Sequence, residues 1–487
     1  MNQSSKNQFG ALNTVMRSTR RQALAAAAAL LAATKNAHAA ETKPNILFIM
    51  ADDFGYADLS CYGRPDYKTP NLDRLAAEGM KFNQAYANSA VCTASRVALI
   101  TGRYQYRLPI GLEEPLNASR NVGLPPSHPT LPSILKKAGY GTSLIGKWHL
   151  GWLPDYSPLK SGYDHFWGIR SGGVDYFTHK TAGPQTDTDD LWDGDVKVHQ
   201  NGYMTDLLAE HAIQSIHNYA QQHTPFLISL HFNAPHWPWE GPEDEAVSKT
   251  LTNLASFETG SIKTYARMVT QMDLQVGRIL KALEASGAAN NTIVVFTSDN
   301  GGERFSNTWP FTGKKTELLE GGLRIPALVR WPGHIKPKST TEQVAMNMDW
   351  LPTLTAAAAT APDPAYPSDG VNLLPVLTAG APPTPRRVYW RYRANAQQAV
   401  RDGDLKYLKI NGNTFLFDVV ADPLERANLK DRRPEDYKRL VQSYEEWQST
   451  MLPLDPAAST YSFTPSQMAD HYSPEVRPAQ PAAKGKP

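Results

Sequence analysis

Short apolar runs alternate along the chain with longer stretches in which apolar residues recur every three to four positions. The runs that most resemble strands span residues 45–50, 141–145, 225–232, 292–298 and 325–333. Residues 69–80 and 265–287 carry the helical spacing, and a glycine lies at or near the end of each. Continuously apolar strands that alternate with amphipathic helices are typical of buried, mostly parallel sheets. We therefore predict an α/β fold in which helices sandwich a large mixed, mostly parallel sheet.

The pattern changes after about residue 375. Residues 381–387 form a turn-rich connection, and four short apolar runs follow, separated by turn signals such as Asp402-Gly403 and Asn411-Gly412. A helical pattern covers about 434–451. We predict a large α/β domain over 40–375, a smaller antiparallel α+β subdomain over 376–455, and a tail without fixed structure over 456–487, which is rich in Pro, Ala and Ser.

Residues 1–39 are typical of a bacterial export signal. Paired Arg20 and Arg21 precede an apolar run, and Ala37-His38-Ala39 forms a cleavage motif. The pair resembles a twin-arginine signal, although Ala23 stands where phenylalanine is usual. We expect a periplasmic or secreted protein. No later apolar run is long enough to span a membrane, and a net charge of +2 gives no reason to expect nucleic acid binding.

The chain has only two cysteines, Cys61 and Cys92. Exported proteins often carry a disulfide framework, and here one intramolecular pair is the most that can form. Cys92 lies at the polar start of a predicted helix that ends at Gly102, and Arg96 follows on the first turn. This setting favours a chemical role for Cys92, whereas Cys61 suits a small buried side chain.

Polar residues follow directly after four of the predicted strands. They are Asp52 and Asp53, Lys147 and His149, His236, and Asp299 and Asn300. Ligands gather at the carboxyl ends of strands in open α/β sheets, so we expect these side chains to meet. Three carboxylates and an amide oxygen form a hard-oxygen set that suits Ca²⁺, with Mg²⁺ as the alternative. A divalent cation would also relieve the repulsion between the carboxylates.

Two basic residues near this set predict an oxyanion site. Lys147 and His149 are two residues apart, so both side chains point into one pocket if the extended geometry continues past the strand. Lysine and arginine beside a metal favour sulfate or phosphate. Residues 141–147 also match the glycine–lysine spacing of a phosphate-binding loop. Trp148 replaces its Ser/Thr, and the intervening residues are the apolar strand itself, so we reject nucleotide binding.

Several motifs together resemble the sulfatase family, within the alkaline-phosphatase-like superfamily. The segment CTASRVALITGR, from Cys92, is similar to the family's signature of Cys/Ser-x-Pro-Ser-Arg followed by a helix ending in Thr-Gly-Arg. GKWHLG, SDNGG and GKKTELLEGGLRIP recur in the family's order, and the resemblance covers most of 43–420. It implies an alkaline-phosphatase-like fold and a sulfuric ester hydrolase.

The resemblance also implies a role for each site residue. Cys92 would be oxidised to formylglycine, whose hydrate is the nucleophile, and Arg96 would stabilise that hydrate. Ca²⁺ would be held by the oxygen of modified residue 92 together with Asp52, Asp53, Asp299 and Asn300. Lys147 and His149 would orient and deprotonate the hydrate, and His236 would protonate the leaving alcohol. Lys315 would contact the sulfate, because it precedes Glu320 by the family's five residues.

One departure from the family concerns the maturation enzyme that converts the cysteine. The signature's proline is Ala94 here; the aerobic formylglycine-generating enzyme reads that proline, whereas the radical-based maturase also accepts alanine. The preferred hypothesis is an exported hydrolase of aryl or carbohydrate sulfates. One alternative is a phosphodiesterase or phosphonate monoester hydrolase on the same fold, although such sites commonly carry Asp-His where this chain has Asp299-Asn300. A second is a non-catalytic protein that binds sulfated glycans, if Cys92 stays unmodified.

The natural substrate is not readable from these motifs. Three segments carry aromatic and charged residues that suit either sugar binding or packing, namely 171–180, 236–240 and 389–393.

Overall fold

The computed structural model describes residues 43–181, 188–251 and 260–463. The predicted export signal lies outside these residues. Contacts divide the chain into residues 1–43 and 44–487, and the second unit holds every helix and strand of the described residues. Within the same residues, no helix is both long enough and apolar enough to cross a membrane.

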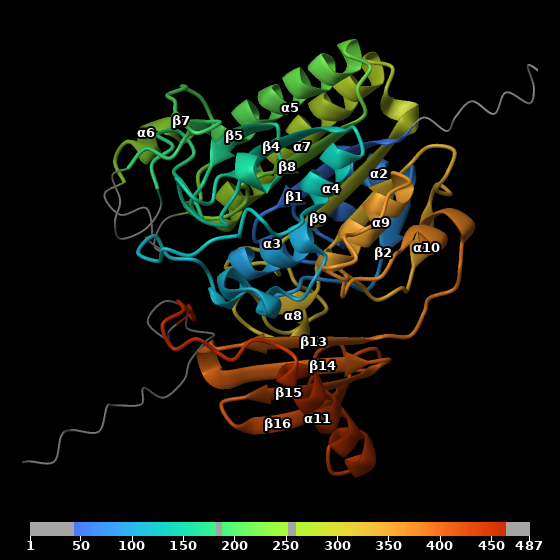
Figure 1. Ribbon diagram of the computed structural model, residues 1–487. Coiled ribbons are helices and arrows are strands. Elements are labelled where there is room, and N and C mark those ends of the chain that lie inside the picture. Colours follow the sequence, from blue (N-terminus) through green and yellow to red (C-terminus); the bar gives the residue numbers. More distant parts are fainter. Residues whose placement is uncertain (1–42, 182–187, 252–259, 464–487) are drawn as a thin grey trace, which may run out of the picture. The chain divides into compact units, whose positions relative to one another are not determined.

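A ten-stranded mixed sheet forms the centre of the large domain (Figure 1). Its strand order is β11-β2-β10-β9-β1-β8-β4-β5-β6-β7. The bounds are β1 Asn45–Ala51, β2 Met80–Phe82, β4 Gly141–Lys147, β5 His165–Ile169, β6 Trp192–Asp193, β7 Val196–Lys197, β8 Phe226–His231, β9 Thr292–Ser298, β10 Ala327–Arg330 and β11 Ser339–Thr341. The five strands from β9 to β5 run parallel, and β10 pairs antiparallel with β9. The predicted mixed, mostly parallel sheet is confirmed.

Helices cover both faces of this sheet, because its central strands are apolar on both sides. On β1, Leu47 and Ile49 belong to one core cluster while Phe48 and Met50 belong to the other. The first cluster includes residues of α2 (Pro70–Ala77), α5 (Met204–Gln221) and α7 (Ile262–Ala285). The second includes residues of α3 (Cys92–Thr101), α4 (Leu131–Lys137), α9 (Trp350–Ala357) and α10 (Leu374–Ala379). The short helices α6 (Glu245–Ser248) and α8 (Glu320–Leu323) lie in loops.

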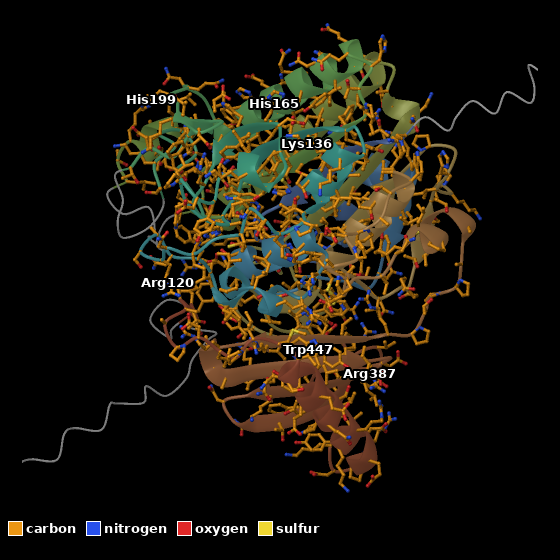
Figure 2. All side chains as sticks on the ribbon, viewed as in Figure 1. Arg120, Lys136, His165, His199, Arg387 and Trp447 are labelled. Carbon is orange, nitrogen blue, oxygen red and sulfur yellow. The ribbon has the colours of Figure 1, made fainter. Side chains whose placement is uncertain are left out.

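The C-terminal part forms a four-stranded antiparallel meander with one helix, as predicted. Its elements are β13 Arg387–Tyr392, β14 Gln397–Asp402, β15 Leu405–Ile410, β16 Asn413–Asp418 and α11 Pro434–Ser449. Trp447 of α11, labelled in Figure 2, packs against the rings of Tyr104 and Tyr106 from the large domain. A separate two-stranded sheet pairs β3 (Ala85–Tyr86) with β12 (Ala345–Met346).

Two expectations differ from the structure. Lys147 is the last residue of β4, not the second residue after it, because β4 continues to pair with β5 through that position. Residues 456–463 fall in the segment for which we expected no fixed structure, yet Ala458 is buried and the Ser459 amide donates to Glu113. Composition favoured disorder there, and these contacts with the large domain override it. The rest of that segment lies outside the described residues.

Candidate active site

The polar residues after the central strands meet at one edge of the sheet. Backbone hydrogen bonds continue past the strands, since the Asp299 amide donates to Ala51 O and the Asp52 amide donates to Ala234 O. β1 lies between β9 and β8, so the residues that follow these three strands are neighbours in space. The side chains that follow β1, β8 and β9 therefore meet at this edge, as expected from the strand ends.

Each of three buried carboxylates pairs with one buried cation. Lys147 Nζ lies 2.6 Å from Asp52 Oδ2, and Lys315 Nζ lies 2.6 Å from Asp53 Oδ2. Asp299 Oδ2 accepts from Arg96 Nε at 3.1 Å and from Nη2 at 2.9 Å. The pairing brings Lys315, which is far along the chain from the other cations, into the same cluster.

The ion pairs of Asp52 and Asp53 differ in how far the neighbouring cations balance the carboxylate charge. Burial and the neighbouring Asp299 carboxylate raise the pKa of Asp52 well above its usual range, although Lys147 opposes this shift. Burial alone would also raise the pKa of Asp53, but Lys315 and His236 more than offset it and hold the pKa below its usual range. The cluster therefore has room for one more positive charge beside Asp52.

The donor set of this cluster fits a divalent cation. Asp52 Oδ1 and Asn300 Oδ1 are buried and have no hydrogen-bond partner among the described residues. Ligand atoms of Asp52, Cys92 and Asp299 lie within 4.8 Å of one another. Oxygens left without partners in a buried acidic cluster are the donors that Ca²⁺ or Mg²⁺ takes.

Cys92 is the first residue of α3 and adjoins this cluster. It is 2% exposed, every residue of α3 is buried, and both cysteines of the chain are free thiols. Burial raises the pKa of the Cys92 thiol, although Lys147 and Lys315 oppose the shift. A thiol that keeps its proton is a weak nucleophile, so the side chain in this form does not suit direct attack.

Arg96 lies one turn further along α3 and contacts residues at the ends of β9, β4 and β8. Besides its bonds to Asp299, its Nη1 donates to Lys147 O at 3.1 Å. His231, the last residue of β8, lies beside this contact, with Nδ1 3.3 Å from Lys147 O. The sequence pattern did not single out His231, because it falls within the apolar run of its strand.

His149 reaches the site by a bend in the chain. Its φ of 55° is left-handed, so the extended geometry does not continue past β4 as expected. Nε2 lies 3.1 Å from Leu116 O, and Nδ1 is buried with no partner among the described residues. A carbonyl accepts only, so Nε2 carries the hydrogen and Nδ1 is a free acceptor. Burial and then Lys147 lower the pKa of His149 well below its usual range.

His236 is held by its own neighbour in sequence. Its Nδ1 lies 2.6 Å from Trp237 O and therefore donates, and its Nε2 lies 3.6 Å from Asp53 Oδ2. Burial and then Lys315 lower the pKa of His236 well below its usual range, while Asp53 opposes the shift. The two imidazoles thus present opposite nitrogens: Nδ1 of His149 and Nε2 of His236.

Two adjacent glycines leave space for these imidazoles. A Cβ on Gly172 would lie 2.7 Å from Cε1 of His149, and a Cβ on Gly173 would lie 3.0 Å from Cε1 of His236. Neither glycine has a left-handed φ, so what the site uses is the missing side chain. All ten residues predicted from the sequence thus belong to one buried cluster.

Comparison with known families identifies this arrangement. The family model described as Sulfatase matches residues 44–360. The chain belongs to the sulfatase family. A second model, the C-terminal part of N-sulphoglucosamine sulphohydrolase, matches residues 311–449. As a member of this family, the protein is a sulfuric ester hydrolase.

Individual relatives agree with this family. The sulfatase is 35% identical to human N-acetylgalactosamine-6-sulfatase over 71% of this chain and 67% of the relative. It is 30% identical to human arylsulfatase A over 89% of this chain and 92% of the relative. A crystal structure of Ps i-CgsB in complex with k-i-k-neocarrahexaose has a TM-score of 0.77 and 30% identity, covering 86% of this chain and 95% of that one. Phosphonate monoester hydrolase of Agrobacterium radiobacter, at 22% identity and a TM-score of 0.59, shares the fold.

One buried carboxyl group of the sulfatase site was not predicted from the sequence. Glu303 is 5% exposed, and its carboxylate lies 3.8 Å from Lys315 Nζ. Burial, with a contribution from Asp53, raises the pKa of Glu303 to about 8 against the effect of Lys315. The sequence did hold one signal for it: Glu303 follows Asp299-Asn300-Gly301-Gly302 directly, in the loop that leaves the end of β9.

Of the two roles considered for the aromatic segments, sugar binding or packing, the structure favours packing for the residues that it buries. Tyr176, Trp239 and Trp390, one from each of the three segments, are at most 4% exposed. Trp309 is instead 66% exposed, on the loop that runs from Glu303 to Lys315. Both ends of that loop lie in the site, so the loop brings one exposed aromatic residue into its surroundings.

Proposed function

We propose that this sulfatase is an exported enzyme that hydrolyses sulfate esters of saccharides, with aryl sulfates as small surrogate substrates. The observation that supports this most is the placement of Cys92, at the buried start of α3, within reach of the acidic cluster and of three cations. As a plain thiol it suits neither metal binding by oxygen nor attack on sulfur. Conversion of Cys92 to formylglycine would remove both difficulties, and the aldehyde hydrate would supply two hydroxyl groups on one carbon.

The chain's own residues would then divide the work. Asp52, Asp53, Asp299 and Asn300, with the oxygen of modified residue 92, would hold Ca²⁺ or Mg²⁺. The ion would supply positive charge next to the sulfate oxygens. Arg96, Lys147 and Lys315, all at most 5% exposed, place three further positive charges in a site that excludes water, where charge stabilisation is strongest.

The two imidazoles are suited to opposite proton transfers. His149 has a free acceptor at Nδ1, and its lowered pKa keeps the ring neutral, so this nitrogen is open to take a proton from the hydroxyl that attacks sulfur. His236 holds its Nδ1 hydrogen on Trp237 O, and a proton on its Nε2 would lie 3.6 Å from the Asp53 carboxylate. That arrangement suits donation of a proton to the leaving alcohol once the negative charge of a bound sulfate offsets Lys315, which after burial lowers the pKa of His236.

A saccharide substrate is favoured by two kinds of observation. The relatives reported above include a sulfatase named for N-acetylgalactosamine and a structure that holds a neocarrahexaose. In this chain, exposed Trp309 offers a flat apolar surface on a loop that starts and ends in the site. We also propose that residues 1–39 direct export and that the host's maturation enzyme accepts Ala94 within Cys92–Arg96.

The mass of the peptide that contains Cys92 tests the proposal. The protein is expressed in its native host, and its turnover of nitrophenyl sulfate, nitrophenyl phosphate and a panel of sulfated mono- and disaccharides is measured on the same preparation. We expect the mass of an aldehyde at residue 92 and preference for sulfate esters. An active preparation in which residue 92 is still a thiol would contradict the proposal.

Cys92→Ala is the matched control, since it should leave a folded, metal-binding and inactive protein. Faster turnover of the phosphate ester would favour the phosphonate monoester hydrolase alternative. Binding of sulfated saccharides without turnover, with a maturation enzyme co-expressed, would favour a glycan-binding protein.

A further inference from the structure

The turn formed by residues 113–116 connects His149 to the start of α3. Leu116 O accepts the Nε2 hydrogen of His149 at 3.1 Å. The amide of the same residue donates to Thr93 Oγ1 at 3.0 Å, and Thr93 follows Cys92 directly. A single residue of this turn thus contacts the neighbour of Cys92 with one backbone group and the candidate base with the other.

The turn is held in place by a segment more than three hundred residues away in sequence. We define the C-terminal strap as residues 455–461, which follow α11. Ser459 donates to Glu113 Oε2 from its amide at 2.8 Å and from its hydroxyl at 2.7 Å, and that hydroxyl also lies close to Pro115 O. The Glu114 amide donates to Ser459 O at 2.9 Å, and Thr460 Oγ1 donates to the Glu114 carboxylate at 3.1 Å.

The strap is itself fixed to the C-terminal sheet. Arg393, directly after β13, donates to the carbonyls of Asp455, Pro456 and Ala458. Arg120, labelled in Figure 2, donates to both Glu113 and Asp455 and so joins the region of the turn to the strap. The Tyr392 hydroxyl donates to Tyr461 O at 2.7 Å and lies 3.3 Å from Glu114 O.

We propose that the C-terminal strap positions His149 for the reaction by fixing the turn 113–116, whose Leu116 carbonyl holds the imidazole. The strap residues act through this turn and are positioning residues. The inference rests on the proposed role of His149 as the base. It accounts for why bonds from Ser459 and Thr460 converge on a turn whose last residue, Leu116, contacts both His149 and Thr93.

Truncation tests the strap as a whole. A chain that ends at Leu454 lacks the strap, and a chain that ends at Phe463 retains it and serves as the control. With an aryl sulfate, we expect the shorter chain to lose about tenfold or more in kcat, because a small displacement of a catalytic group has an effect of this order. KM and the inhibition constant of inorganic sulfate should stay within about twofold, since Arg96, Lys147 and Lys315 are held by bonds to Lys147 O, Asp52 and Asp53.

Ser459→Ala provides a milder version that keeps the backbone contacts. Ser449→Ala is the matched control, because its hydroxyl donates to Glu446 O within α11, away from the turn. We expect a several-fold fall in kcat for Ser459→Ala alone. The ring N–H signal of His149, assigned by its loss in His149→Gln, should exchange faster with water in Ser459→Ala than in Ser449→Ala.

The outcomes separate this inference from the proposed function. Wild-type kcat and an unchanged His149 N–H signal in both strap variants would overturn the inference in an active sulfatase. A loss of thermal stability with kcat preserved would also overturn it, because the strap would then only stabilise the fold. If the wild-type enzyme showed no sulfatase activity, the proposed function would fail, and the N–H signal would still decide whether the strap holds His149.

Discussion

The two halves of the active site are built in different ways. The carboxylates of the ionic half follow β1 and β9, where the sheet register places them. Its cations are Lys147 at the end of β4, Arg96 on α3 and Lys315 in a loop. Ala51 pairs with Ser298, so the next residues along each strand, Asp52 and Asp299, come together without further help. The imidazole half depends on loops: Leu116 O orients His149 and Trp237 O orients His236.

The two halves show that placing a side chain in the site and orienting its reactive atom are achieved by different parts of the fold. A strand end brings a side chain to the right edge of the sheet, but the useful nitrogen of an imidazole is set by what the other nitrogen contacts. Loss of an ionic residue should therefore remove binding and chemistry together. A change around the imidazoles should lower the rate while metal and sulfate still bind.

The largest effect is expected from the ionic half, in Asp299→Ala. The substitution removes a proposed metal ligand and the nearer carboxylate partner of buried Arg96, at 2.9 Å, leaving it only Asp52 at 3.8 Å. We expect bound Ca²⁺ to be lost and turnover to fall by about three orders of magnitude or more. Elemental analysis of the purified protein and rates with an aryl sulfate check this. Wild-type turnover without a bound ion would show that Asp299 is not a ligand.

An intermediate effect is expected from Gly172→Ala in the imidazole half. The new Cβ would lie 2.7 Å from Cε1 of His149, so the ring must move. We expect kcat to fall by about tenfold to a hundredfold, with Ca²⁺ content unchanged. Gly139→Ala is the control, because Gly139 has a φ of 87° and a Cβ there would have no atom within 4 Å, so it should lower stability alone. Equal kcat in Gly172→Ala and wild type would mean that His149 tolerates displacement.

The smallest effect on turnover is expected from Glu240, a buried carboxyl group near His236, whose change should appear in stability instead. Glu240 is 1% exposed, accepts from the Tyr176 amide at 3.0 Å and is affected by the charge of nearby Asp175. Burial, followed by the Asp175 charge, raises the pKa of Glu240 to about 9 from an ordinary 4.5. The Tyr176 hydroxyl donates to His236 O at 2.9 Å. Glu240 and Tyr176 together therefore support the loop that carries the His236 imidazole.

The raised pKa of Glu240 determines how the stability of the folded protein changes with pH. The stability contributed by the neutral carboxyl is fully present below about pH 4.5 and is lost as the pH rises through about 9. Glu240→Gln stays neutral throughout, so the wild type should lose stability relative to the variant between pH 5 and 9, by at most about 1.4 kcal/mol per pH unit. Urea unfolding of both proteins across this range checks the slope. A stability difference that does not change with pH would mean that Glu240 is ionised in the folded protein.

The sequence allowed the ionic half to be predicted nearly in full. The run 45–50 became β1, 292–298 became β9, and the polar residues directly after them lie where parallel strands end. Burial of both faces makes such strands conspicuous as continuous apolar runs, and the register then determines which residues meet. The fold class followed from the same alternation of runs and amphipathic helices.

The imidazole half could be predicted only as a set of residue types. His149 was expected to continue an extended segment, whereas its left-handed backbone and its bond to Leu116 decide which nitrogen is free. That contact joins residues 33 positions apart, and the strap behind it comes from the far end of the chain. The Gly172-Gly173 pair was missed for the same reason, because its role depends on the two imidazoles beside it. Glu303 had a local signal in its place after Gly301-Gly302, but its pairing with Lys315 is visible only in the structure.

The burial of α3 bears on when Cys92 can be modified relative to folding and export. With Cys92 2% exposed and all of α3 enclosed, no enzyme can reach the thiol once the chain has folded. Under the proposed function, oxidation of Cys92 must therefore come before folding, and also before any export route that carries folded proteins. A host that folds the chain faster than it oxidises residue 92 would accumulate a stable, metal-binding protein that later exposure to the maturation enzyme cannot rescue.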